Sequence, residues 1–119
     1  MTDTKLGVFE SKFADIIWEK EPVSTKELVA ICEKEFSWKR TTTYTVLKRL
    51  CEKGLFKTEK STVTPLLTRD EFYAKKSENF VKESFGGSLP AFLTAFSSNR
   101  KLSKKEVDEI KKMIDNYGE

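Results

Sequence analysis

Histidine is missing altogether from this sequence, and cysteine occurs only at Cys32 and Cys51. The absence of histidine removes the commonest general base, the commonest metal ligand and the usual partner of a cysteine or serine nucleophile. The two cysteines are far apart and form no CxxC cluster of the kind that binds zinc. The composition therefore argues against an enzyme, and it predicts no metal and no cofactor.

The cysteine content is also too low for a disulfide framework, which favours two reduced thiols packed in a core. Cys51 follows Arg49 near a basic face, so a thiol-based redox sensor is an alternative interpretation. No apolar stretch approaches the roughly 20 residues that a membrane span requires. Because the N-terminal residues show no signal-peptide pattern either, we expect a cytoplasmic protein without membrane insertion.

Charge is plentiful but unevenly distributed. The net charge is +3, yet residues 1–35 contain five lysines against eight acidic residues. Residues 39–60 contain seven basic residues against two acidic ones. Such a concentration of positive charge attracts a polyanion, which makes nucleic acid the first candidate partner.

The N-terminal half has the element order of a winged helix-turn-helix. Apolar spacing predicts helices over residues 9–20, 24–36 and 39–53; Ser24 and Glu27 have the spacing of a capping box, and Gly54 ends the third helix. Alternating residues in 55–60 and 61–67 then predict a short hairpin, with Pro65 restricting the second strand to the edge of the sheet. We expect a mainly α fold with a small β-hairpin, in which residues 1–67 form the DNA-binding domain.

The remaining residues, 68–119, are predicted to form a helical dimerisation arm. Capping spacings at Thr68 and Ser103 and a break at Gly86 and Gly87 predict three helices. The arm is too short for a separate core, so its apolar residues predict a two-fold dimer, although folding back on the first domain in a monomer is an alternative. The predicted dimerisation residues are Phe72, Phe80, Phe85, Leu89, Phe92, Leu93, Phe96, Val107, Ile110 and Ile114.

The third helix is unusual because it is rich in threonine. Its inward stripe is predicted to be Thr43, Val46, Leu47 and Leu50. On its other faces, short threonine side chains would let the backbone approach a groove, where hydroxyl groups bond phosphates or base edges. A solvated helix that merely confers solubility is the simpler alternative. The predicted DNA-binding residues are Lys39, Arg40, Thr41, Thr42, Tyr44, Thr45, Lys48 and Arg49, together with Ser24 and Lys57.

Three stretches resemble one known family. Residues 38–54, with the pattern WxxxTxYTVLKRLxxKG, resemble the recognition helix of the penicillinase and methicillin-resistance repressors. Residues 85–96, FGGSLPAFLTAF, are similar to the start of that family's dimerisation arm, and TPLLTRDEF to its link from wing to arm. The resemblance extends from Phe9 to Ile114, and it implies a homodimeric repressor that binds a palindromic operator, with Thr42, Thr45 and Arg49 facing the DNA.

The sequence also departs from the family pattern. Thr41 occupies a position where a lysine is common, and the wing is short. The chain lacks the C-terminal cysteine cluster of the related copper-responsive repressors. In this family, the members that respond to β-lactams are switched off by cleavage at an Asn-Phe bond in the arm, and the aligned bond here is Ala95–Phe96. The resemblance thus implies a membrane sensor or a protease acting upstream as a further partner. A winged-helix module that binds a protein partner, or a redox-responsive regulator, remains the alternative function.

Overall fold

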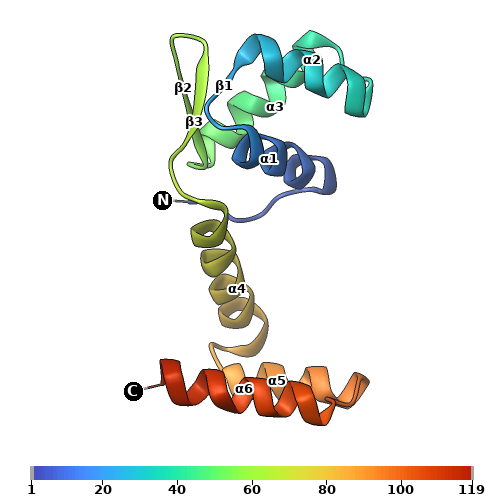
Figure 1. Cartoon of the computed structure of the whole chain (residues 1–119), viewed down its shortest axis with the longest axis vertical. Coiled ribbons are helices and arrows are strands. Elements are labelled where there is room, and N and C mark those ends of the chain that lie inside the picture. The colour runs from blue at the N-terminus through green and yellow to red at the C-terminus, as the bar shows by residue number, and fades with distance from the viewer. Residues whose placement is uncertain (1, 119) are drawn as a thin grey trace. The chain divides into compact units, whose positions relative to one another are not determined.

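A computed structural model describes residues 2–118, which form six helices and three short strands (Figure 1). The chain divides between Asn79 and Phe80 into two compact units, called here the N-terminal unit and the C-terminal unit. The predicted fold class, mainly helical with a small sheet and a winged helix-turn-helix, is confirmed. In chain order the elements are α1 (Val8–Lys20), β1 (Val23–Ser24), α2 (Thr25–Phe36), α3 (Arg40–Glu52), β2 (Phe56–Glu59), β3 (Thr62–Pro65), α4 (Arg69–Phe85), α5 (Leu89–Asn99) and α6 (Lys104–Tyr117).

Local signals account for the ends of α2 and α3. The Ser24 hydroxyl accepts the Glu27 N–H at 3.0 Å, so the first turn of α2 is capped as predicted. Ser37 ends α2 in the left-handed region, at φ 57°, and turns the chain toward α3. Gly54, at φ 87°, follows α3 where a side chain would be strained.

The sheet has three strands rather than the two predicted. Its order is β1-β3-β2, with β3 antiparallel to both neighbours. The prediction that Pro65 confines β3 to the edge is therefore wrong: β1 pairs only with Thr62 and Val63, whereas Pro65 pairs on one side with Phe56. The hairpin between β2 and β3 turns through Lys60 and Ser61, both with positive φ, which is the geometry of a tight two-residue turn.

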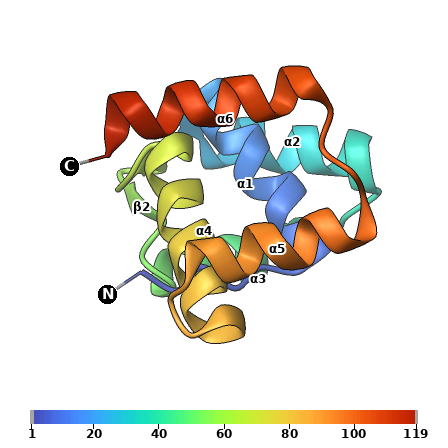
Figure 2. The ribbon, with the colours of Figure 1, turned by 90° about the horizontal axis from the view of Figure 1, so that it is seen from below.

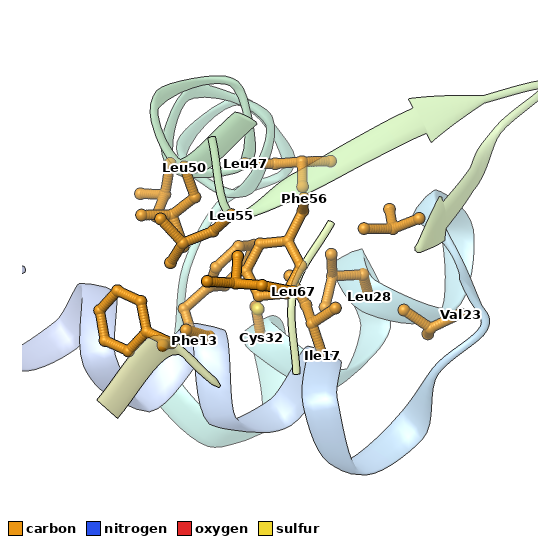
Figure 3. Packing of buried hydrophobic residues seen from close by; sticks show 14 residues of the cluster. Phe13, Ile17, Val23, Leu28, Cys32, Leu47, Leu50, Leu55, Phe56 and Leu67 are labelled. Atoms are coloured by element: carbon orange, nitrogen blue, oxygen red, sulfur yellow. The ribbon is translucent and has the colours of Figure 1, made fainter. Parts of the chain in front are cut away.

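The core lies between the first three helices and the sheet (Figure 3). Phe13 and Ile17 from α1, Leu28 from α2, and Leu50 from α3 are fully buried. Cys32 lies among them, as predicted for a core thiol. Phe9, near the start of α1, is 56% exposed, and its ring lies against Phe36 and Trp38.

The start of α4 belongs to the N-terminal unit. Thr68 and Glu71 form the predicted reciprocal capping box, with hydrogen bonds of 2.8 and 3.1 Å. Phe72 is fully buried, with its ring centroid 5.3 Å from that of Trp18, whose indole N–H donates to the Leu67 carbonyl at 3.0 Å. Phe72 is thus corrected from a dimerisation residue to a core residue, because its burial is complete within one chain. For the same reason the two units meet after Asn79, later than the predicted boundary at Thr68.

The C-terminal unit has helices but no buried core. None of residues 80–118 is buried. Phe80, Phe85 and Phe92 contact one another edge to face, with centroids 5.6–6.1 Å apart. Figure 2 shows α5 and α6 joined by a short loop, and Ser103 caps α6 in the predicted box with Glu106.

Candidate nucleic-acid interface

The helix α3 has one apolar face and one polar face. Its predicted inward stripe, Thr43, Val46, Leu47 and Leu50, is buried throughout, at 7% exposure or less. The opposite positions are exposed, as the 3.6-residue period requires. The exposed side chains are those of Arg40, Thr41, Thr42, Tyr44, Thr45, Lys48 and Arg49. The core therefore holds α3 in place and leaves a continuous polar surface outside it.

Threonines form the middle of this surface. The Thr45 hydroxyl donates to the Thr41 carbonyl at 2.9 Å, one turn earlier. Between α1 and α3 lies a surface hollow of about 390 Å³. Its lining residues are Phe9, Glu10, Trp38, Thr41, Thr42, Thr45, Val46 and Arg49. Predicted DNA-binding residues from one face of α3 thus share a concave surface with α1.

Basic side chains lie at the start of α3 and on the wing. Lys39 occupies the N-cap, and the Arg40 guanidinium lies 5.5 Å from the centre of the Tyr44 ring. Hydrogen bonding to Thr25, and then to Arg40, lowers the pKa of the exposed Tyr44 phenol. On β2, the Lys57 ammonium lies 3.7 Å from the Glu59 carboxylate.

At its C-terminal end, α3 is connected to α1 by an ion-pair cluster. One carboxylate oxygen of Glu10 lies 3.4 Å from an Arg49 guanidinium nitrogen, and the other lies 3.4 Å from the Lys53 ammonium. The Gly7 N–H also donates to Glu10 at 2.9 Å. The Gly7 hydrogen bond, with smaller contributions from Lys53 and Arg49, lowers the pKa of Glu10, so the carboxylate is ionised at neutral pH.

The structure brings most of the predicted DNA-binding residues together on α3, but two of them lie elsewhere. Ser24 is half-buried at the N-terminus of α2, where its hydroxyl is engaged in capping, and Lys57 lies on the wing. Sequence reasoning missed Glu10 as part of this surface. In the sequence, Glu10 lies three residues after Gly7 at the start of a helix. This spacing indicates a helix cap, and it does not indicate a contact with Arg49.

The two thiols differ in burial, since Cys32 is buried and Cys51 is half-buried. Cys32 is fully buried, and burial raises the pKa of its thiol. Burial also raises the pKa of Cys51, whose sulfur lies 3.8 Å from the Thr58 hydroxyl. Because desolvation disfavours the thiolate, the raised pKa of Cys51 argues against the alternative interpretation as a redox sensor.

Within residues 2–118, no three histidine, cysteine, aspartate or glutamate side chains gather as metal ligands would. Nor does any helix there combine the length and the apolar character needed to cross a bilayer.

Comparisons with known proteins agree with this architecture. The model of the penicillinase repressor family matches residues 6–116. The penicillinase repressor of Bacillus licheniformis is 25% identical over 121 residues, which cover 98% of this chain and 91% of that protein. The penicillinase repressor of Staphylococcus aureus is 25% identical over 114 residues (92% and 90%), and the methicillin resistance regulatory protein MecI of S. aureus Mu50 is 24% identical over 109 residues (88% and 89%). The chain therefore belongs to the penicillinase repressor family, whose members are DNA-binding transcriptional regulators and not enzymes.

Proposed function

We propose that this protein is a homodimeric repressor that inserts α3 into the major groove of an inverted-repeat operator. The observation that carries the proposal is the exposed row of Thr41, Thr42, Thr45 and Arg49 on a helix whose opposite face is anchored in the core. A helix presented in this way fits the width of the major groove of B-DNA. Short side chains at its centre let the backbone approach the bases.

Each part of the surface has a distinct role in this proposal. Thr42 and Thr45 meet base edges or thymine methyl groups, and Arg49 contacts guanine or a phosphate. Lys39, Arg40 and Lys48 bind phosphates, Tyr44 meets the sugar-phosphate backbone, and Thr41 lies at the entry of the helix. Lys57 extends the phosphate contacts to the wing. Ser24 contributes through the N-terminus of α2, which it caps.

Dimerisation is supported by the apolar surface of the C-terminal unit. Phe80, Leu89, Phe96 and Ile114 are 41–56% exposed, and Phe85, Phe92, Leu93, Val107 and Ile110 are half-buried. Exposed apolar area of this extent usually marks a protein interface. An isologous two-fold dimer would cover it and place two copies of α3 about one DNA turn, roughly 34 Å, or a small multiple of it apart. Occupation of the operator then blocks access to a promoter.

The inducing route remains a prediction. Ala95 and Phe96, which align with the cleavage bond of the family, are exposed but lie within α5. Proteolysis there requires local unwinding of the helix, so cleavage by a protease under an upstream sensor would have to open α5 first. Incubation of the dimer with the protease that cleaves the related repressors, followed by mass spectrometry, tests whether the Ala95–Phe96 bond is cut.

Selection of random duplex DNA by the purified protein, beside sedimentation, tests the proposal. The expected result is an inverted repeat bound by a dimer, with affinity that falls about 10³-fold between 50 and 200 mM salt if about six phosphates are contacted. Arg49→Ala should weaken binding to the selected operator. Arg69→Ala is the matched control, because it removes the same charge from a residue paired with Asp15 on α1. Salt-labile binding without any enriched sequence would favour the protein-interaction module instead.

A further inference from the structure

We propose that Glu10 is a positioning residue for sequence recognition: its carboxylate, on α1, holds the Arg49 guanidinium in the orientation that reads the operator. This inference rests on the proposed function, in which Arg49 faces DNA. It adds a residue from outside the helix-turn-helix to the determinants of specificity, and that residue is acidic.

The Glu10 carboxylate is itself held by a hydrogen bond from its own helix. Its side chain is only 13% exposed, although it lies near the surface of α1. The Gly7 N–H donates to Oε1 at 2.9 Å and so connects the carboxylate to the first turn of its own helix. A charged group fixed by a backbone donor is a better anchor than a freely rotating surface glutamate.

The two cations that approach Glu10 have different exposures. Lys53 is 20% exposed, and its ammonium donates both to Glu10 Oε1 and to the backbone carbonyl of Lys5 at 2.5 Å. Arg49 is 52% exposed and uses one terminal nitrogen on Glu10 Oε2 at 3.4 Å. Lys53 thus serves as the less exposed counter-ion of Glu10. Arg49, one turn earlier on α3, keeps most of its guanidinium at the surface.

This division of roles has a consequence for recognition. An arginine side chain has many rotamers, and an unrestrained one can reach phosphates on any sequence. Anchoring one terminal nitrogen to Glu10 keeps the guanidinium beside the hollow that Glu10 and Arg49 line together with Thr42 and Thr45. The carboxylate also repels a phosphate that approaches from the α1 side. Both effects favour one geometry of Arg49, which raises specific binding relative to non-specific binding.

The test compares Glu10→Gln with Glu19→Gln, which removes the same charge from an exposed position on the same helix. Affinities for the selected operator and for a scrambled duplex of equal length are measured at one salt concentration. We expect Glu10→Gln to lower the ratio of specific to non-specific affinity by about three- to fivefold, as for loss of a partly exposed ion pair. Glu19→Gln should leave the ratio unchanged. Equal effects of the two variants would overturn the proposal, because they would reveal only a general charge effect.

Two further variants separate positioning from folding. Glu10→Asp keeps the charge but shortens the reach, so it should lower the specificity ratio as well, even if Glu10→Gln fails to fold. In an Arg49→Ala background, Glu10→Asp should change the ratio no further, and an undiminished effect there would refute the role through Arg49. Should the unmodified protein select no sequence, the proposed function fails. Should it select an operator while Glu10→Asp keeps the full ratio, only this inference fails.

Discussion

Replacing Phe72 with alanine tests whether α4 begins as part of the N-terminal unit. The Phe72 side chain is completely buried, with a relative exposure of 0%. The centre of its ring lies 5.3 Å from that of Trp18 and 5.2 Å from that of Tyr73. Alanine at this position leaves a cavity among aromatic side chains. A residue that served only the dimer interface would leave no such cavity within one chain.

The expected loss of stability is large. Truncation of a buried phenylalanine to alanine costs about 3–5 kcal/mol, which combines lost transfer free energy with the cavity left behind. Because small domains are stable by only about 5–15 kcal/mol, this is a substantial fraction of the free energy of unfolding. The indole of Trp18 should also become more mobile, since Phe72 forms one side of its environment.

Urea unfolding followed by tryptophan fluorescence measures the effect, and Phe96→Ala is the matched control. Phe96 is 41% exposed, lies on α5 and is not a member of the buried cluster of the N-terminal unit. We expect Phe72→Ala to lower the free energy of unfolding without altering the dimer dissociation constant in sedimentation, and Phe96→Ala to do the reverse. A loss below about 1 kcal/mol for Phe72→Ala, together with dissociation into monomers, would show that the burial argument is wrong.

The other predictions concern DNA binding, assembly and acid stability. Arg49→Ala should weaken operator binding by about 1–3 kcal/mol in a mobility-shift assay, as expected for a base-directed contact; unchanged affinity would remove it from the interface. Phe92→Asp should yield monomers in sedimentation, because a charge would enter the apolar surface of the C-terminal unit, and a persistent dimer would place the interface elsewhere. Two hydrogen bonds from Arg100, with the Ser103 N–H, lower the pKa of Glu106 to about 2. Ionised Glu106 therefore stabilises the folded state above pH about 4.5, and this contribution is lost as the pH falls toward 2. NMR titration of Glu106 in Arg100→Ala should find its pKa nearer the ordinary value; the same low pKa would contradict this cause.

The candidate interface was largely predictable because α3 is amphipathic. A 3.6-residue period alone assigns Thr43, Val46 and Leu47 to the core and leaves Thr42 and Arg49 outside. The starts of the capped helices could be predicted from the sequence for the same reason, since a capping box depends on two residues three positions apart. The roles of these side chains on DNA stay predictions, because operator contacts are not a property of the chain alone.

Long-range pairing was not predictable in the same way. The strand β1 is two residues long, too short for any alternation to be recognised, and it exists because Val23 pairs with Val63 across the sheet. The pairing of Glu10 with Arg49 joins residues 39 positions apart. Neither relationship has a local pattern, because each depends on how α1, α3 and the sheet pack around the core.

By itself, therefore, the sequence determined the helices, their caps, the polar face of α3 and the family resemblance, all of which depend on residues close together in the chain. The tertiary structure alone decided that Phe72 belongs to the core, that β3 is the central strand, that the thiols are desolvated, and that Glu10 meets Arg49. The physical reason is that burial and ion pairing are set by which surfaces meet in space. Periodicity identifies an apolar face without identifying the surface that covers it.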